Sequence, residues 1–342
     1  MSTDRKFKVA VVGATGAVGD ALLGMLAERK FPIGEILALA GSRSAGEEVK
    51  FGGNYVPVHR LADADFADVD IAFFSAGASV SREHVPRATA AGAVVIDNTS
   101  EFRYQNDVPL VVSEVNPHSI AGYTRRGIIA NPNCSTMQML VALAPIHRAV
   151  GIERINVATY QSVSGAGRSG IDELVRQTAA MLSFQDMEPA KFPVQIAFNV
   201  IPQVDEFQDN GYTREEMKMV WETRKILDDD SILVNATAVR VPVFYGHGMA
   251  LHIETRTRIT ANEARVLLER AAGVRIVDTR KAAGYPTPVS HAAGKDAVWV
   301  GRIREDISHP RGLDLWVVAD NLRKGAALNA VQIAEAFVKN HL

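Results

Sequence analysis

The sequence lacks the features that mark several large classes of protein. Its 342 residues include one cysteine, so no disulfide bond can form within the chain, and we expect a cytoplasmic protein. Its 37 basic and 39 acidic side chains give a net charge of −2, which creates no field to attract nucleic acid or an anionic membrane. No apolar run approaches the roughly 20 residues that span a bilayer. The charged start, Met1 to Lys8, leads directly into a strand and not into a signal peptide.

The length and composition are those of a globular protein with a full core. Hydrophobic residues make up 47% of the chain and charged residues 22%, a balance typical of such proteins. Because 342 residues exceed the size of one ordinary domain, we expect two domains.

The first part of the chain alternates between strands and helices. Buried strands are predicted at Phe7–Val12, Glu35–Ala40, Ile71–Ser75, Ala93–Asp97, Leu110–Val112 and Ile128–Ala130. Helical spacing of apolar residues is found at Ala17–Lys30 and Arg82–Ala91. This alternation predicts βαβ units in an α/β domain with a mostly parallel sheet.

The pattern changes after about Asn133. Long β-rich stretches occur at Ile155–Val163, Gln195–Val204, Ile232–Val243, Met249–Arg256, Ala297–Arg304 and Leu313–Ala319. Helices are predicted at Gly170–Leu182, Thr213–Leu227 and Ala261–Ala272. We therefore expect a second, α+β domain over residues 134–321. The amphipathic segment Arg323–Asn340 is expected to return to the first domain, which would comprise residues 1–133 and 322–342.

A glycine-rich loop is the first chemical signal. The motif Gly13-Ala-Thr-Gly16-Ala-Val-Gly19 follows the first strand and opens the first helix, which is the setting of a dinucleotide fingerprint. Its GxxGxxG spacing differs from the usual GxGxxG, so an ordinary glycine turn remains an alternative.

The end of the second strand favours NADP over NAD. Proteins that bind NAD usually place an acid there to bind the ribose 2′-hydroxyl. This chain has Gly41-Ser-Arg43-Ser44 and no acid before Glu47, and hydroxyls with a guanidinium suit a 2′-phosphate. A polar surface loop is the alternative interpretation.

The single cysteine lies in the motif Asn131-Pro-Asn-Cys-Ser-Thr136. Asn133 is a natural N-cap, which places Cys134 in the first turn of a helix. A helix N-terminus favours an anion, so the pKa of a thiol there is expected to fall. A lone cysteine is also often a small buried hydrophobe, and the motif alone leaves both interpretations open.

His247 is the histidine that stands out as a proton partner for Cys134. It lies in Val241-Pro-Val-Phe-Tyr-Gly-His-Gly248, where glycines on both sides leave room for a substrate. A turn histidine without a role is the alternative.

Together these motifs resemble the aspartate-semialdehyde dehydrogenase family. The resemblance rests on the motifs GATGAVG, NPNCST, Gln161-Ser-Val-Ser-Gly-Ala-Gly167, Glu215-Glu-Met-Lys218 and Arg240-Val-Pro-Val with His247. They occur in the family's order and cover nearly the whole chain. The resemblance implies an NADP-binding Rossmann domain joined to a catalytic and dimerisation domain of the glyceraldehyde-3-phosphate-dehydrogenase-like type, and a homodimer.

The resemblance also implies a reaction. The family reduces L-aspartyl-4-phosphate with NADPH to L-aspartate-4-semialdehyde and phosphate, in lysine (through diaminopimelate), methionine and threonine biosynthesis. By this resemblance Cys134 forms an acyl-thioester, and Gln161 orients it. His247 is the general acid/base, with an ordinary pKa near 6.5 suited to neutral pH.

Further residues match the family's binding positions. Arg240 is expected to bind the α-carboxylate and Glu215 the ammonium, whereas Lys218, Arg103 and Asn133 match the phosphate pocket. The residues that match cofactor contacts are Gly13, Thr15, Gly16, Ala17, Val18, Arg43, Ser44, Ser164, Gly165 and Asn321. No ligand spacing for a metal is visible.

One departure from the family pattern follows the histidine. The family often continues with Ser-Glu-Ala-Val, whereas this chain has Gly248-Met-Ala-Leu251. The change removes a hydroxyl and a charge next to His247, and so puts its hydrogen bonds and pKa in question. Alternatives are a paralogue acting on another acyl phosphate such as N-acetyl-glutamyl phosphate, a cofactor-binding module without catalysis, and a thiol hydrolase or acyltransferase.

Overall fold

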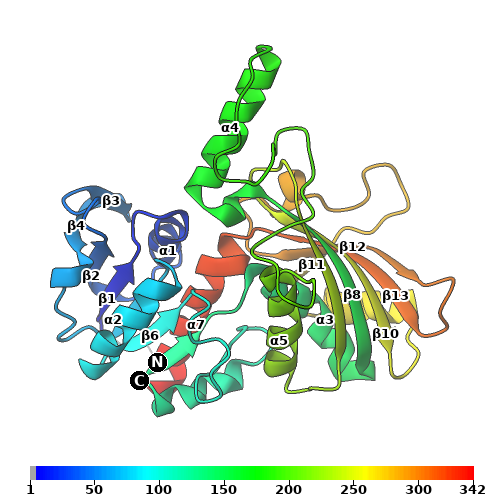
Figure 1. Cartoon of the computed structure of the whole chain (residues 1–342). Coiled ribbons are helices and arrows are strands. Elements are labelled where there is room, and N and C mark those ends of the chain that lie inside the picture. The colour runs from blue at the N-terminus through cyan, green and yellow to red at the C-terminus, as the bar shows by residue number, and fades with distance from the viewer. Residues whose placement is uncertain (1–4) are drawn as a thin grey trace. The chain divides into compact units, whose positions relative to one another are not determined.

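The computed structural model describes residues 5–342, which divide into two compact units. The first unit contains residues 5–133 and 326–342, and the second contains residues 134–325. Each unit has one sheet, and Figure 1 colours the elements along the chain. Among the described residues, no helix is both long and apolar enough to cross a membrane.

The first unit is built on a seven-stranded sheet in the order β3-β4-β2-β1-β5-β6-β7. Neighbouring strands are parallel except β3 and β4, which are antiparallel, so the predicted mostly parallel sheet is confirmed. The strands are β1 (Phe7–Val12), β2 (Ile33–Ala40), β3 (Glu48–Phe51), β4 (Asn54–Arg60), β5 (Ile71–Phe74), β6 (Val94–Asp97) and β7 (Ile128–Ala130). The α-helices are α1 (Ala17–Glu28), α2 (Ala78–Ala90) and α7 (Leu328–His341).

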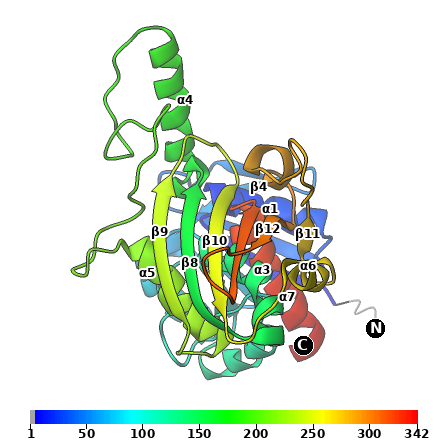
Figure 2. The same ribbon diagram turned by 90° about the vertical axis from the view of Figure 1, so that its right-hand side faces the viewer.

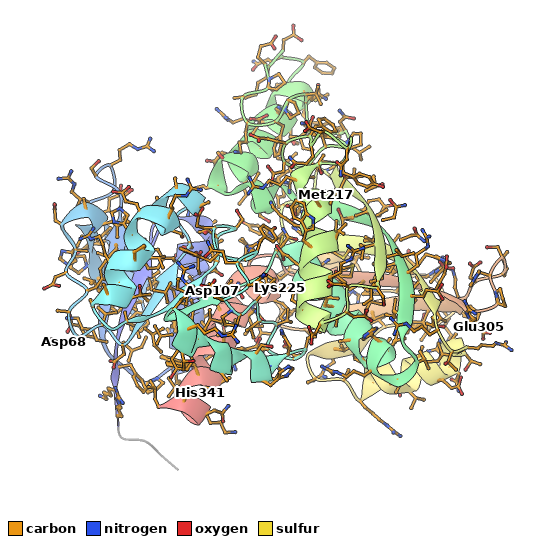
Figure 3. All side chains as sticks on the ribbon, turned by 60° about the horizontal axis from the view of Figure 1, so that its bottom comes forward. Asp68, Asp107, Met217, Lys225, Glu305 and His341 are labelled. Atoms are coloured by element: carbon orange, nitrogen blue, oxygen red, sulfur yellow. The ribbon has the colours of Figure 1, made fainter. Side chains whose placement is uncertain are left out.

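Burial explains why the central strands of this sheet are nearly continuous apolar runs. All but one residue of β1 is buried, because helices cover both faces of a parallel sheet. The C-terminal helix α7 packs on α1, where Arg29 forms two hydrogen bonds of 2.7 Å with Glu335. The rings of Tyr123 and Phe337 meet edge to face at 4.9 Å, and His341, labelled in Figure 3, lies 5.5 Å from Tyr123.

The second unit is built on a six-stranded sheet in the order β11-β12-β13-β10-β8-β9. The pairs β8–β9 and β11–β12 are parallel and the others antiparallel, so the predicted mixed α+β character is confirmed. The strands are β8 (Ile152–Gln161), β9 (Leu233–Arg240), β10 (His247–Thr255), β11 (Val274–Ile276), β12 (Val298–Glu305) and β13 (Gly312–Ala319). The α-helices are α3 (Cys134–Val150), α4 (Arg168–Leu182), α5 (Arg214–Leu227) and α6 (Ala261–Glu269).

Three helices of the second unit, α3, α5 and α6, pack on one face of its sheet. Figure 2 shows β9, β8 and β10 side by side in front of α3, while α4 projects away from the sheet. Helix α5 begins with a capping box, in which Thr213 and Glu216 satisfy each other's backbone N–H groups. Met217 in its first turn and Lys225 in its last turn are labelled in Figure 3.

Two predicted strands are wrong. The stretch Gln195–Val204 forms no strand, and only Ile201 pairs with Arg240 of β9. Phe198 adopts a left-handed backbone (φ 58°), and Pro202 has no N–H to donate, so the pairing cannot extend. At Leu110–Val112 a single bridge from Leu110 to Ala130 replaces the expected strand, because the chain turns at Val112 to form a hydrogen bond with Val115.

The β3–β4 hairpin was not predicted, although its turn carries a signal. Gly52 and Gly53 join the two strands with φ values of 56° and 95°. Positive φ at both central residues defines the two-residue turn that suits a twisted hairpin. The strands themselves are largely exposed, so hydrophobic periodicity does not reveal them.

Candidate active site

The glycine loop of the first unit connects β1 to α1 as expected. Gly13 has a φ of 87°, and its N–H donates to the carbonyl of Leu39 at the end of β2 (2.8 Å). A Cβ atom on Gly19 would lie 2.1 Å from the carbonyl oxygen of Gly13, so only glycine lets the helix sit this close to the loop. The first turn of α1 offers N–H groups to an anion, since Gly16, its N-cap, is exposed.

The residues that favour NADP follow the neighbouring strand. Arg43 is exposed in the turn after β2, and the N–H of Ser44 donates to the carbonyl of Gly41 (3.1 Å). Because β1 and β2 are parallel, this turn and the glycine loop extend from the same edge of the sheet. Thr15, Ala17 and Val18 are partly exposed beside it; the cofactor contacts of all these residues stay predictions.

The second unit brings Cys134 and His247 together. Cys134 is the first residue of α3 and His247 the first residue of β10, and Sγ lies 3.5 Å from Nε2. A Cβ atom on Gly325 would lie 2.8 Å from the Cβ of Cys134, so a glycine is needed there to leave the cysteine in place.

The prediction that His247 has an ordinary pKa is wrong. The ring is fully buried, and burial with the nearby Arg240 guanidinium lowers its pKa from 6.5 to about 3. Its Nδ1 accepts a hydrogen bond from the N–H of Ser162 and lies equally close (3.1 Å) to the Ser162 hydroxyl. The histidine is therefore neutral at pH 7.

Gln161, Glu215 and Lys218 form a connected chain of polar groups in the same unit. Gln161 Nε2 donates to Glu215 Oε1 (3.0 Å), and Lys218 Nζ donates to Glu215 Oε2 (3.0 Å). The lysine also donates to Asp205 (2.7 Å). Burial works against the charge on Lys218, but the carboxylates of Glu215 and Asp205 outweigh it and hold its pKa above the ordinary value.

Arg240 ends β9 beside these residues. Its Nη1 donates to the carbonyl of Ser162 (2.8 Å), and burial lowers the pKa of its guanidinium. A Cβ atom on Gly165 would lie 2.9 Å from Arg240 Nη1 and 3.3 Å from the His247 ring. The absent side chain of Gly165 thus leaves open the space next to both residues.

Ser164 and Asn321, expected at the cofactor, bond to each other in the second unit. Asn321 Nδ2 donates to Ser164 Oγ (3.0 Å), and both side chains are buried. Asn321 Oδ1 accepts from the hydroxyl of Ser162 and from the N–H of Gly246, each at 3.0 Å. Both are thereby linked to the residue that contacts His247; their contacts with a cofactor stay predictions.

Arg103 and Asn133, expected at the phosphate, belong to the first unit. Both are buried, and Arg103 Nη2 donates to the carbonyl of Asn98 (2.8 Å) just after β6. Their role beside Lys218 stays a prediction.

The departure at Gly248 does not reach the histidine. Successive residues of a strand point to opposite faces, so Gly248 lies on the face away from His247. A Cβ atom there would lie 2.7 Å from the ring of Trp316, which fills the space, and Met249 is wholly buried. The hydrogen bonds to the histidine come from Ser162, so a serine at position 248 would not supply them.

The sequence reasoning missed Ser162, Asp205 and Trp316. Ser162 lies within the quoted Gln161–Gly167 motif, which was a usable signal. Asp205 and Trp316 carry no motif of their own, and only the fold places them next to Lys218 and Gly248. Among the described residues, no group of three or more His, Cys, Asp or Glu side chains is arranged to hold a metal ion.

The chain matches two family models. Residues 8–123 match the semialdehyde dehydrogenase NAD binding domain, and residues 143–324 match the semialdehyde dehydrogenase dimerisation domain.

Named relatives agree with these matches over the whole chain. An aspartate-semialdehyde dehydrogenase of Legionella pneumophila is 59% identical over 99% of this chain and 97% of its own length. The crystal structure of aspartate semialdehyde dehydrogenase II from Vibrio cholerae, complexed with ASA, is 57% identical, covers 99% of this chain and 100% of its own, and superposes with a TM-score of 0.97. A Candida albicans aspartate semialdehyde dehydrogenase with NADP is 25% identical over 98% of this chain and 99% of its own, with a TM-score of 0.77. The chain therefore belongs to the aspartate-semialdehyde dehydrogenase family.

Proposed function

We propose that this protein is an NADPH-dependent aspartate-semialdehyde dehydrogenase that converts L-aspartyl-4-phosphate to L-aspartate-4-semialdehyde and phosphate. The observation that carries the proposal is the pair formed by Cys134 Sγ and His247 Nε2, 3.5 Å apart in one unit. The relatives named above support the substrate, and the V. cholerae enzyme is seen with ASA.

The reaction is split in two by the thiol. The thiolate of Cys134, favoured at the start of α3, attacks the acyl carbon. The bond from that carbon to the phosphate oxygen breaks, phosphate leaves with the electron pair, and an acyl-thioester with Cys134 remains. His247 lies close enough to the sulfur to stabilise its negative charge. Gln161, held in place by its hydrogen bond to Glu215, orients the thioester. Bound NADPH supplies the hydride that reduces this carbonyl to the aldehyde.

The charged side chains match the three charged groups of the substrate. Arg240 binds the α-carboxylate, because a guanidinium pairs with a carboxylate through two parallel hydrogen bonds. Glu215 accepts from the ammonium, and Lys218, whose pKa is raised, stays cationic for the phosphate. Arg103 and Asn133 complete the phosphate site in this proposal.

The first unit has the features that the cofactor needs. The close fit of Gly19 on Gly13 brings the backbone N–H groups of the loop and of α1 toward a pyrophosphate, together with Thr15, Gly16, Ala17 and Val18. Arg43 and Ser44 suit a 2′-phosphate, which favours NADP(H) over NAD(H). Ser164, Gly165 and Asn321 are proposed on the nicotinamide side, and the related C. albicans enzyme is described with NADP.

We further propose a cytoplasmic homodimer. The second unit matches a dimerisation domain. The face of its sheet opposite Met249 holds a shallow cavity of about 470 Å³, lined by residues including Asn156, His252 and Trp316. That face is a suitable surface for a second copy of the chain. The cytoplasm keeps the reactive thiol reduced.

The test is the reaction run toward the acyl phosphate. Purified protein is mixed with L-aspartate-4-semialdehyde, NADP⁺ and phosphate, and absorbance of NADPH is followed beside a Cys134→Ala control. Formation of NADPH that needs both phosphate and Cys134 supports the proposal. A silent wild type, or equal turnover with N-acetyl-glutamate semialdehyde, contradicts it.

A further inference from the structure

The chain that returns from the projecting helix α4 is fastened to that helix by a buried carboxylate (Figure 2). We call residues 183–201, which follow α4, the return segment. Glu173 lies in α4 and is wholly buried. Its Oε2 accepts the backbone N–H groups of Ala190 (3.2 Å) and Lys191, and its Oε1 accepts that of Phe192 (3.4 Å). Because a buried charge needs such donors, the carboxylate fixes the return segment at Phe192.

A second side chain of α4 supports the first. Gln177 lies one turn further along the helix, and its Nε2 donates to Glu173 Oε1 (3.0 Å). Its Oε1 accepts the backbone N–H groups of Ile196 (2.8 Å) and Ala197 (3.1 Å). Ile196 and Ala197 belong to a small buried cluster that also contains Val163, from the loop after β8. The return segment is thus attached both to α4 and to a loop of the candidate active site.

The return segment contacts Arg240 at two points. Ile201 exchanges both backbone hydrogen bonds with Arg240, at 2.8 and 2.9 Å. The guanidinium carbon of Arg240 lies over the ring of Phe192, 6.0 Å from its centre. An aromatic face attracts a guanidinium, and the attraction is stronger where both groups are out of water. Arg240 Nη1 also donates to Ser162 (2.8 Å), and since arginine has five N–H donors, others can meet a carboxylate.

The start of α4 is shaped for this packing. A Cβ atom on Gly170 would lie 2.6 Å from the carbonyl oxygen of Val163 and 3.2 Å from Cζ of Phe192. The missing side chain therefore lets the helix, the loop after β8 and the aromatic ring pack together.

We infer that Glu173 and Phe192 are positioning residues for Arg240. Glu173 fixes the return segment, and Phe192 holds the guanidinium in the orientation in which it meets the α-carboxylate of the substrate. That carboxylate does not change during the reaction, so the loss of either residue should raise the substrate KM more than it lowers kcat. The link to the α-carboxylate rests on the proposed function, whereas the contact between Phe192 and Arg240 does not.

Removing the ring tests its contact with Arg240. In Phe192→Leu of the full-length protein, we expect the KM for L-aspartate-4-semialdehyde to rise about tenfold, with kcat and the KM for NADP⁺ within about twofold of wild type. Phe184→Leu, the same change at a fully exposed position of the return segment, is the matched control and should alter none of these constants. An unchanged KM for the semialdehyde in Phe192→Leu, or an equal rise in the KM for NADP⁺, overturns the inference.

Replacing the buried carboxylate tests how the return segment is held. In Glu173→Gln, either orientation of the amide turns an NH₂ group toward backbone N–H donors, so residues 190–192 should loosen. We expect their amides to exchange hydrogen about tenfold faster, and the KM for the semialdehyde to rise as in Phe192→Leu. Glu188→Gln, an exposed acid of the same segment, is the control. Faster exchange with an unchanged KM overturns the role of Glu173.

Chemical modification separates a failure of this inference from a failure of the proposed function. Phenylglyoxal reacts with arginine side chains without any turnover, and its rate at Arg240 is followed by peptide mass. We expect this rate to be about fivefold higher in Phe192→Leu than in wild type and Phe184→Leu, because the ring no longer holds the guanidinium. If the wild type is inactive with the semialdehyde and the rate still rises, the proposed function fails while the positioning of Arg240 stands. Equal rates in the three proteins overturn the positioning, whatever the activity.

Discussion

The glycine loop of the first unit and the Cys134–His247 pair of the second unit are built by opposite means. The loop depends on the absence of side chains. Because Gly19 has no Cβ, α1 can pack directly on Gly13, and backbone N–H groups remain available to bind an anion. The pair and its neighbours work through side chains whose charge states are set by burial and by nearby charges. Burial and Arg240 lower the pKa of His247, whereas the carboxylates of Glu215 and Asp205 raise the pKa of Lys218 against the effect of burial. Added atoms should therefore damage the first site, and altered charges the second.

The largest effect is expected from adding one carbon to the loop. In Gly19→Ala the new Cβ would start 2.1 Å from the Gly13 carbonyl, so the helix has to move away. We expect a loss of about 3 kcal/mol in the free energy of unfolding, typical of severe overpacking, and at least tenfold weaker NADPH binding. Gly24→Ala in the same helix is the control, because nothing lies within 4 Å of its Cβ, and alanine should stabilise it by up to about 1 kcal/mol. Denaturant unfolding and NADPH titration measure both; equal behaviour of the two variants would contradict the close fit.

Replacing a glycine by alanine in the second unit, at Gly165, should affect catalysis more than folding. The Cβ of Gly165→Ala would lie 2.9 Å from Arg240 Nη1 and crowd the His247 ring. A misplacement of catalytic groups by about 1 Å can cost roughly a hundredfold in kcat/KM, and we expect a loss of this size. Steady-state kinetics with Gly24→Ala as the control checks it, and a variant that keeps more than half of the wild-type kcat/KM would show that the space beside Arg240 is not used.

A smaller stability effect should appear at low pH. Because the pKa of His247 is about 3 in the folded protein and about 6.5 when unfolded, the unfolded chain binds the extra proton between these values. His247 therefore lowers the free energy of unfolding by up to about 1.4 kcal/mol per pH unit as the pH falls from 6.5, and contributes no pH dependence above it. When the free energy of unfolding is measured in urea from pH 7.5 to 5, it should fall more steeply with decreasing pH for wild type than for His247→Gln. Identical slopes would mean that the ring is protonated in the folded state.

The smallest effect concerns Asp205, which the family resemblance did not indicate. Its carboxylate contacts Lys218 at 2.7 Å but is about a third exposed, so its loss should cost only ~1 kcal/mol. We expect Asp205→Asn to raise the KM for phosphate about fivefold in the reaction from the semialdehyde. Glu206→Gln, an exposed neighbouring acid, serves as the control. An unchanged KM for Asp205→Asn would leave Glu215 alone to hold Lys218.

The sequence predicted those features that depend on neighbouring residues. Strand β1 and helices α1 and α5 follow from apolar spacing and from local signals such as the capping residue Thr213. The glycine loop is likewise local, because its spacing and the strand before it lie within 13 residues. Local patterns failed at Gln195–Val204, where β-rich composition is overridden by the left-handed Phe198 and by Pro202.

The residues of the second unit's site, except Ser162, could be named but not arranged. Cys134, Ser162, Glu215, His247 and Asn321 span almost the whole unit and meet only because β8 pairs with both β9 and β10. The pKa of His247 depends on burial and on Arg240, which no spacing in the sequence reveals. The effect of Gly248 could be judged only when strand alternation and Trp316 placed it on the opposite face.

In the proposed reaction Cys134 carries the acyl group, and a reaction run without phosphate should trap that intermediate. Wild-type protein is mixed with L-aspartate-4-semialdehyde and NADP⁺ alone, and NADPH absorbance is recorded together with the mass of the protein and of its Cys134 peptide. We expect a burst of about one NADPH per active site and an acyl adduct on Cys134 that phosphate removes, with neither in Cys134→Ala. Continued turnover without phosphate, or NADPH formation with no adduct on Cys134, would contradict the claim.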